Sequence, residues 1–331
     1  MKLSILDQVP LSKGMTSTEA LQNSVQLAQL GDELGYTRMW LAEHHNTNTI
    51  ASSAPEVTAA YLAAKTSNIN IGTGGVMMMH YSPLKVAEVF KTLAALAPNR
   101  IDLGVGRAPG GDGAAMTALA SGRRPDFTEQ YDKLEVILNL IEEKPTHEPI
   151  YDAVVAIPEK VALPSAWLLG SSGQSATQAG QLGVGYSFAQ FFNGQMSKQI
   201  FDAYRNSFVP SSFMDKPSII TTYATCVAET AEEAEYLSMP MQISRLQLMR
   251  GNMRPTLSPE EANNYPLTEI EKLHLQKNRE FYFIGAAKDV AEQILEEQAI
   301  YGFDEAMINC NLFTMEQRLN NYRLLAKYLI K

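Results

Sequence analysis

The sequence predicts a closed barrel of eight parallel β-strands, each followed by an α-helix. Short apolar runs typical of buried strands alternate with amphipathic helical segments along nearly all of the 331 residues. Three successive runs end in unusual turns, which are Glu43-His44-His45, Thr73-Gly74-Gly75 and Gly104-Val105-Gly106-Arg107. Eight strands closing into a (β/α)8 TIM barrel is the most economical arrangement, and a doubly wound open sheet is the alternative. We expect one domain, residues 1–331, with insertions near 108–125, 145–164 and 251–280.

Strands are expected where apolar and β-branched residues gather between turn signals. These runs are residues 3–6, 38–42, 70–73, 101–105, 166–169, 184–188, 219–228, 281–284 and 306–310. Helices are expected between them, because apolar residues recur there at helical spacing. The helical segments are residues 17–34, 55–65, 83–98, 127–141, 175–182, 197–208, 231–249, 288–301 and 315–329.

Several helix boundaries carry specific signals. Ser17-Thr18-Glu19 opens the first helix, and Gly35 ends it. Pro55 and Pro83 stand at the first position of the next two helices, where a missing N–H costs nothing. Residues 145–164 are punctuated by prolines and predict a short hairpin. Residues 251–276 are polar and predict a long excursion or lid.

Alternation within the strands predicts what lines the barrel. In the run 101–106 the odd positions are branched and apolar, while the even positions are Asp102, Gly104 and Gly106. The run 69–74 repeats the pattern, with two glycines at even positions. The branched residues should face the helices, which leaves glycines at the barrel mouth and space there for a ring system. The alternative interpretation is that the glycines only ease strand curvature.

Two adjacent histidines follow the second strand. Because neighbours on a strand point to opposite faces, His44 and His45 are poorly placed to share one metal ion. His44 shares its face with Trp40 and Ala42, so it should point into the mouth. There it can donate a hydrogen bond or act as a general base. The alternative is a structural histidine that satisfies a buried carbonyl.

Two features indicate an anion site. Arg107 follows Gly104-Val105-Gly106 directly, and a guanidinium beside glycines suits bidentate binding of a phosphate. The loop Gly170-Ser171-Ser172-Gly173-Gln174-Ser175 offers backbone N–H groups and hydroxyls at a helix N-terminus. A surface salt bridge and simple helix capping are the structural alternatives. Neither a Walker loop nor a Rossmann Gly-x-Gly-x-x-Gly pattern occurs.

Composition limits the classes of partner that the chain can be expected to bind. A net charge of −9 with no basic block argues against nucleic acid or a membrane surface. Cys226 and Cys310 match no metal or redox spacing, so no metal site is expected. Sparse cysteine, the lack of a signal-peptide core and the lack of a membrane-length apolar run predict a cytoplasmic protein.

The assembled residues resemble the bacterial luciferase-like flavin-dependent monooxygenases. The resemblance covers nearly the whole chain, and residues 40–45, 72–77, 100–107 and 170–176 carry it. It implies a single barrel, usually a homodimer, that uses reduced FMN supplied by a separate NAD(P)H-flavin reductase.

The resemblance also assigns site residues. It implies that Arg107, Ser172 and Ser175 hold the FMN phosphate, with Gly173 in the same loop. Gly74–Gly75 would form a non-prolyl cis peptide beneath the flavin ring, and His44, with His45 beside it, occupies the catalytic position. Gly106 stands where luciferase itself has a reactive cysteine.

The expected activity is therefore that of a monooxygenase acting on paired donors with incorporation of molecular oxygen. An aldehyde, alkane, sulfonate or ring carbon would each suit an apolar cavity. Hydride transfer with a deazaflavin is the alternative activity, and a non-catalytic flavin-binding subunit is the third hypothesis. Small residues on two helices are expected to form the homodimer seam. These residues are Ala59, Ala60, Ala63, Ala64, Ala94, Ala95 and Ala97.

Overall fold

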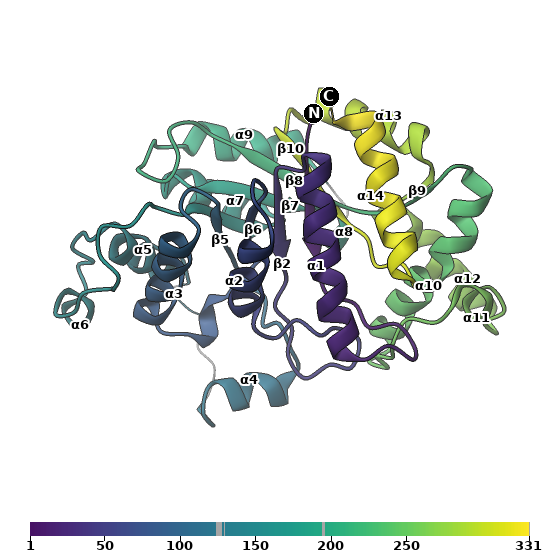
Figure 1. Cartoon of the computed structure of the whole chain (residues 1–331), viewed down its shortest axis with the longest axis horizontal. Coiled ribbons are helices and arrows are strands. Elements are labelled where there is room, and N and C mark those ends of the chain that lie inside the picture. The colour runs from purple at the N-terminus through teal and green to yellow at the C-terminus, as the bar shows by residue number, and fades with distance from the viewer. Residues whose placement is uncertain (124–127, 129, 194–195, 331) are drawn as a thin grey trace.

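The strands close into a parallel barrel (Figure 1). The computed structural model describes residues 1–123, 128, 130–193 and 196–330. The ring consists of β1 (Lys2–Asp7), β2 (Arg38–Leu41), β3 (Asn70–Thr73), β5 (Ile101–Gly106), β6 (Ser165–Gly170), β7 (Gly185–Ala189), β8 (Ile219–Ala228) and β10 (Glu305–Asn309). Because β10 pairs in parallel with both β1 and β8, the predicted (β/α)8 barrel is confirmed and the open-sheet alternative is wrong.

Two further strands lie beside the ring. The short β4 (Val76–Met77) pairs with the end of β5 and continues the sheet beyond β3. β9 (Tyr282–Ala286) pairs with residues 224–228, the carboxyl-terminal half of β8. The run 281–284 is thus a strand, as predicted, but it is not one of the eight that close the barrel.

Long helices cover the outside of the ring (Figure 1). They are α1 (Ser17–Leu34), α2 (Pro55–Lys65), α3 (Pro83–Leu96), α5 (Gln130–Ile141), α7 (Gly173–Gln181), α9 (Lys198–Ser207), α10 (Ala231–Met249), α13 (Ala287–Tyr301) and α14 (Met315–Leu329). The predicted boundary signals act as expected: Gly35 ends α1 with φ 81°, and Pro55 and Pro83 begin α2 and α3. Phe127, the predicted start of α5, and residues 124 and 125 of the first insertion lie outside the described residues.

Shorter helices lie in the connections. They are η1 (Met78–His80), α4 (Gly113–Leu119), α6 (Pro149–Asp152), α8 (Gln190–Asn193), α11 (Pro259–Asn263), α12 (Glu269–Asn278) and η2 (Arg279–Phe281). The hairpin predicted within 145–164 is wrong, because Pro149 starts the single helical turn of α6 there and no described residue of that segment is in a strand.

The excursion at 251–276 is more ordered than its polar sequence indicates. Capping boxes start both of its helices, with Ser258 and Glu261 at α11 and Thr268 and Glu271 at α12. Their apolar side chains pack against α10 in a separate cluster. Its buried members are Ile243, Leu246, Ala262 and Leu275. The Ser-x-x-Glu and Thr-x-x-Glu spacings were the available sequence signals for these helices.

The predicted alternation is confirmed inside the barrel. Odd-numbered residues of β5 belong to the large core between strands and helices, whereas Asp102 points inward. The interior apolar cluster consists of Leu6, Trp40, Ala42, Trp167, Ile220 and Met307. Next to it, buried Arg38 bonds Asp102 and Glu305, each at 2.8 Å. Burial raises the pKa of Asp102, although Arg38 beside it acts in the opposite direction.

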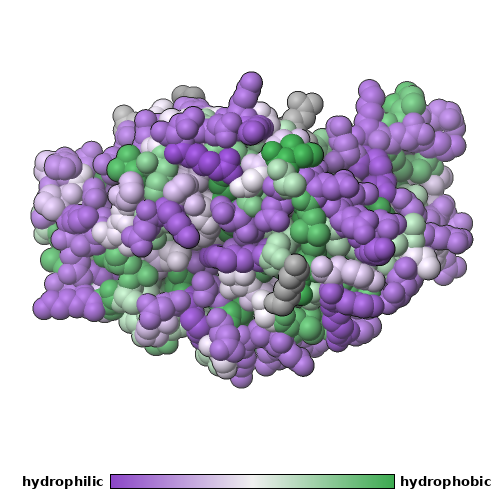
Figure 2. All heavy atoms as spheres, turned by 90° about the horizontal axis from the view of Figure 1, so that it is seen from above, coloured by the Kyte–Doolittle hydropathy of each residue, from purple (hydrophilic) through white to green (hydrophobic). Residues whose placement is uncertain are grey.

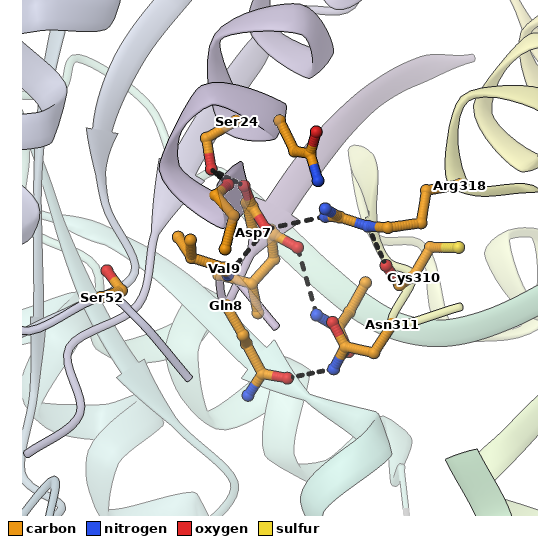
Figure 3. A network of polar contacts seen from close by, with 12 residues as sticks. Asp7, Gln8, Val9, Ser24, Ser52, Cys310, Asn311 and Arg318 are labelled. Atoms are coloured by element: carbon orange, nitrogen blue, oxygen red, sulfur yellow. Dashed lines mark hydrogen bonds and ion pairs between the residues drawn. The ribbon is translucent and has the colours of Figure 1, made fainter. Parts of the chain in front are cut away.

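A buried ion pair ties the end of β1 to two helices (Figure 3). Asp7 accepts hydrogen bonds from Ser24 of α1 at 2.6 Å and from Arg318 of α14 at 2.8 Å. The same carboxylate accepts the backbone N–H of Val9, which has φ 55°. The chain therefore leaves β1 in a fixed direction.

The chain termini and the helix that follows β5 lie at opposite ends of the barrel. Both termini lie at the upper edge of Figure 1, whereas α4, which follows β5, lies at the lower edge. Figure 2 views the face with the termini, where hydrophilic residues predominate and apolar ones form only small groups. Within the described residues, no helix has the length and apolar character required to cross a membrane.

Candidate active site

The predicted site residues meet at the carboxyl ends of the strands. His44 follows β2, Gly74 and Gly75 follow β3, Arg107 follows β5, and Ser172 follows β6. The pairing of Met77 with Gly106 places the glycine turn and Arg107 at the same rim. Strand ends that are distant in sequence thus lie at one rim, where active sites of barrels of this kind are found.

Gly74–Gly75 is a cis peptide bond, as the family resemblance implies. Neither residue has room for a side chain. A Cβ on Gly74 would lie 2.9 Å from Leu6 Cδ1, and one on Gly75 would lie 2.8 Å from the Gly104 carbonyl oxygen. By contrast, the nearest atom to a Cβ on Gly106 is Met77 Sδ at 3.7 Å, an ordinary contact. The bare backbone of Gly74–Gly75 is therefore required by packing, while glycine at 106 leaves space open.

Arg107 lies beside Tyr131 and near Tyr186. Its guanidinium lies 4.9 Å from the centre of the Tyr131 ring, a cation–π contact. Among the described residues, Arg107 Nε and the Tyr131 hydroxyl are both buried without a hydrogen-bond partner. Buried polar atoms without partners are rare in native proteins, and a catalytic or ion-binding role is one of the reasons for them. Sequence reasoning missed Tyr131, because nothing in its own segment indicates which strand end it faces.

The serine loop lies close to Arg107, because both are near the Tyr186 side chain. Ser172 caps α7, and its Oγ lies 3.2 Å from Ser175 Oγ. Ser175 is fully buried, and its hydroxyl lies 3.3 Å from the Tyr186 hydroxyl. Burial raises the pKa of Tyr186 to about 12, so its hydroxyl stays protonated at neutral pH. Ser175 and Tyr186 brace the loop, and open space lies where Gly173 would carry a Cβ. A hollow of about 510 Å³ opens beside Gly173.

His44 presents a free ring nitrogen. Its Nδ1 is buried without a hydrogen-bond partner in the part of the chain that the structure describes, and its backbone N–H donates to the Ser52 carbonyl at 2.8 Å. Burial lowers the pKa of His44, and Glu43 only partly opposes this effect. The imidazole is therefore neutral at pH 7, which leaves it able to accept or donate a proton.

His45 points elsewhere, as expected for the neighbouring residue. Its Nε2 donates to Glu43 at 2.8 Å. The fully buried Glu43 carboxylate also accepts the Met77 backbone N–H at 2.8 Å and the Tyr81 hydroxyl at 2.6 Å. Glu43 thus joins the end of β2 to the segment after the cis peptide. The sequence marked the Glu-His-His cluster but gave no role to Glu43, because its partners come from another βα unit.

The lid segment crosses the loops after β1 and β2. Thr256 exchanges backbone hydrogen bonds with Leu11 and Lys13, at 3.0 and 2.8 Å. Met253 Sδ accepts a hydrogen bond from Thr47 Oγ1 at 3.9 Å. Residues 251–257 therefore lie over the part of the rim that carries His44. Among the described residues, no group of three or more His, Cys, Asp or Glu is placed to hold a metal ion.

Comparison with known proteins decides the family. A sequence model of the luciferase-like monooxygenases matches residues 1–306. The chain belongs to this family. It is 35% identical over 331 residues to the N-acetyl-S-alkylcysteine monooxygenase of Bacillus subtilis (strain 168), covering 98% of this chain and 97% of the relative. The crystal structure of apo-MsnO8 superposes with a TM-score of 0.90 at 34% identity, covering 99% and 98% of the two chains.

More distant members show the fold alone. The oxygenating constituent of a 3,6-diketocamphane monooxygenase from Pseudomonas putida, in complex with FMN, gives a TM-score of 0.71 at 15% identity, covering 99% of this chain and 97% of that one. An F420-dependent secondary alcohol dehydrogenase also gives 0.71 at 15% identity, covering 99% and 98%. The oxygenase component of a flavin-dependent trigonelline monooxygenase from Acinetobacter baylyi is 24% identical, covering 89% of this chain and 84% of that protein. Family membership thus supports a monooxygenase activity.

Proposed function

We propose that this family member is an FMN-dependent monooxygenase that acts on a small organic substrate. The observation that carries the proposal is the Arg107 guanidinium, whose Nε is buried without a partner among the described residues, beside the unpartnered Tyr131 hydroxyl. Burial raises the pKa of Tyr131, so this hydroxyl is a neutral donor. A cation, a hydroxyl donor and a helix N-terminus together fit a phosphate group.

The residues present fit FMN. Arg107, Tyr131 and Ser172 would hold its phosphate with the first N–H groups of α7, and the bare Gly74–Gly75 backbone would support its ring. Gly106 leaves space beside that support. Reduced FMN, when bound, supplies the electrons that activate molecular oxygen. The chain's own part is to position the ring, to keep water out beneath the lid, and to hold or move a proton at His44 Nδ1.

His44 is expected to act on turnover and not on flavin affinity. His44→Ala should lower the rate of oxygen consumption by protein-bound reduced FMN by about 100-fold, the lower range for general acid–base groups. Because burial lowers the pKa of His44 below 6.5, the neutral imidazole persists into mildly acidic solution. Activity that needs it should therefore fall only as pH drops below about 6.5, and His44→Ala should remove this acid limb.

The measurement uses FMN reduced chemically, so that no reductase limits the rate. Oxygen consumption and the ratio of oxygenated product to hydrogen peroxide are followed between pH 5 and 8. His274→Ala is the matched control, because His274 is an exposed histidine on α12. Normal turnover and an unchanged pH profile in His44→Ala would remove His44 from the mechanism.

A deazaflavin is the alternative to FMN as the cofactor. The F420 enzyme of similar fold favours deazaflavin-dependent hydride transfer as the second candidate. Titration of the purified chain with FMN and with F420 separates the two activities, and F420 binding without FMN binding would overturn our proposal. A separate NAD(P)H-flavin reductase is proposed as a transient partner, because the trigonelline enzyme is named as an oxygenase component.

The substrate class and the cellular compartment are each proposed from a single observation. The name of the Bacillus subtilis relative makes N-acetyl-S-alkylcysteines the first compounds to test. The two cysteines, Cys226 and Cys310, are buried and free, which fits a cytoplasmic location.

We also propose a homodimer through α2 and α3, although the alanines predicted to form its seam are mostly unavailable. Ala59, Ala63, Ala94 and Ala97 are buried in the chain's own core, where small side chains let the helices approach the barrel. Larger apolar residues are exposed on the same helices instead. They are Val57 (65%), Tyr61 (49%) and Leu96 (74%).

The exposed apolar residues give a test of the dimer. The double variant Tyr61→Glu/Leu96→Glu should be monomeric by light scattering at micromolar concentration, while wild type is dimeric. Ile300→Glu on α13 is the control, because Ile300 is similarly exposed at 60% on another helix. A wild-type monomer, or a double variant that stays dimeric, would contradict this seam.

A further inference from the structure

A small cavity lies between the start of α2, the first half of α3 and β4. Its volume is about 110 Å³. Apolar side chains form most of its wall, and they are Val76, Val86, Val89 and Phe90. Glu56, Tyr81 and Lys85 complete the wall, so an acid and a base line the same cavity. Sites that bury whole organic ligands measure roughly 300–1,000 Å³, so this smaller cavity suits a single apolar side chain.

The two charged residues of this wall lack partners of opposite charge. Within the described part of the chain, neither Glu56 nor Lys85 forms an ion pair. Burial raises the pKa of Glu56, and Lys85 is among the groups that oppose this effect. Glu56 is half-buried and Lys85 is exposed. A carboxylate and an ammonium group at one cavity are therefore both available to another molecule.

The cavity belongs to an exposed, partly apolar surface of the same two helices. Lys85, Val89 and Leu96 recur at helical spacing and so share one face of α3. Leu96 is exposed, as is Val57, which follows Glu56 on α2. Figure 1 shows α2 and α3 on the outside of the barrel. The cavity thus lies on the surface proposed above for the homodimer.

A two-fold dimer can satisfy both charges at once. In such a dimer the same surface of each copy meets itself, so every contact occurs twice. If Glu56 of one copy meets Lys85 of the other, the second pair follows by symmetry. One chain offers an acid, a base, an exposed apolar side chain and a cavity for such a side chain. This surface is therefore complementary to a second copy of itself.

One wall of the cavity reaches the candidate active site. The Tyr81 hydroxyl donates to Glu43 Oε1 at 2.6 Å. Glu43 also accepts the backbone N–H of Met77, which follows the glycine turn, at 2.8 Å. A side chain that fills the cavity therefore packs against the residue that holds Glu43 at the rim.

We propose that a second copy of this chain closes the cavity, with Glu56 paired to the partner's Lys85, and that this contact holds Tyr81 against Glu43. The exposed Val57 next to Glu56 supplies the apolar side chain that enters the partner's cavity. The inference rests on the homodimer proposed above and does not require monooxygenase activity.

The first experiment mixes two charge-reversed variants. Glu56→Lys alone places two bases at each contact, and Lys85→Glu alone places two acids there. Each variant should therefore self-associate about 100-fold more weakly than wild type, because like charges meet twice. An equal mixture should form heterodimers with about wild-type affinity, since each contact then joins an acid to a base. Native mass spectrometry and sedimentation velocity measure both results, and mixing cannot restore a pair that forms within one chain.

Lys65→Glu is the matched control for this rescue. Lys65 is exposed at the other end of α2, so its variant mixed with Glu56→Lys should stay weakly associated. Circular dichroism checks the fold of each variant. Glu56→Gln and Lys85→Gln guard against a folding failure of the reversed variants, with an expected loss of about 10-fold in dimer affinity. Rescue by Lys65→Glu in place of Lys85→Glu would overturn the pairing.

The second experiment tests the link between the cavity and the rim. If dimer contact holds Glu43 in the arrangement that binds flavin, saturating FMN should tighten the wild-type dimer by about 5-fold or more, because coupling between two binding events is reciprocal. Tyr81→Phe removes the hydroxyl that reaches Glu43, so this variant should dimerise but lose the response to FMN. A wild-type dimer that FMN binds without tightening would overturn the link.

The outcomes separate this contact from the FMN assignment. If wild type binds no FMN, the proposed function fails, yet heterodimers in the mixture of reversed variants still support the pair between subunits. The pair is overturned if wild type is monomeric or if each reversed variant dimerises as wild type does. It is equally overturned if the mixture forms no heterodimer.

Discussion

Arg107→Ala is expected to weaken FMN binding by about 100-fold, because charged hydrogen bonds contribute about 1.5–3 kcal/mol each and 1.4 kcal/mol is a factor of ten. The guanidinium is held beside Tyr131 with its Nε buried and unpartnered. Without it, the remaining hydroxyls and N–H groups near Ser172 carry no positive charge. The effect is measured by anaerobic titration with reduced FMN and by fluorescence titration with oxidised FMN.

A titration with riboflavin distinguishes binding of the phosphate from binding of the ring. It has the same ring as FMN but no phosphate, so Arg107→Ala should change its affinity little. Arg323→Ala is the control, since Arg323 is exposed on α14 and forms an ion pair with the exposed Glu316. An equal loss of affinity for FMN and riboflavin would mean that Arg107 supports the fold or the ring and does not bind the phosphate.

The largest effect on stability is expected inside the barrel. Arg38→Met should lower the free energy of unfolding by about 3–5 kcal/mol, because it leaves buried carboxylates without their cation. Arg38 is 7% exposed and bonds both Asp102 and Glu305. The loss is measured by urea denaturation followed by circular dichroism. Arg323→Met is the control, with an expected change below about 1 kcal/mol for an exposed pair.

The pH dependence of this variant has a definite sign. Burial already raises the pKa of Asp102 above its unfolded value of 3.8, and removal of Arg38 raises it further. The folded variant then holds a proton that the unfolded chain releases, so its stability falls as pH rises. The difference from wild type should therefore be larger at pH 8 than at pH 5. An Arg38→Met protein as stable as wild type at pH 8 would contradict this account.

Local sequence signals predicted the positions of the site residues well. Alternation within a strand is a property of the backbone, so the inward direction of Asp102 followed from counting residues. Parallel strands in a barrel all end at one rim, which brought Gly74–Gly75, Arg107 and the Ser172 loop together without any knowledge of contacts. The two helices of the lid segment were not predicted. Its polar composition indicated a loop, although the capping boxes at Ser258 and Thr268 indicate helix starts.

Contacts between βα units could not be predicted in the same way. The alanines of α2 illustrate this, because a small residue allows close packing either against the barrel or against a partner. Ala59 and Ala63 are buried, so these two side chains pack within the chain's own fold and not against a partner. Glu43 is similar, because its three donors come from its own turn, from β4 and from the segment after η1.

By itself, the sequence determined the closed barrel, the rim on which the chemistry-bearing residues lie, and the family resemblance. Only the tertiary structure decided that Tyr131 accompanies Arg107, that Tyr186 braces Ser175, and that Gln8 meets Asn311. The physical reason is one of range. Strand alternation and helix caps depend on residues a few positions apart, whereas these pairings depend on how distant segments pack, and 303 positions separate Gln8 from Asn311.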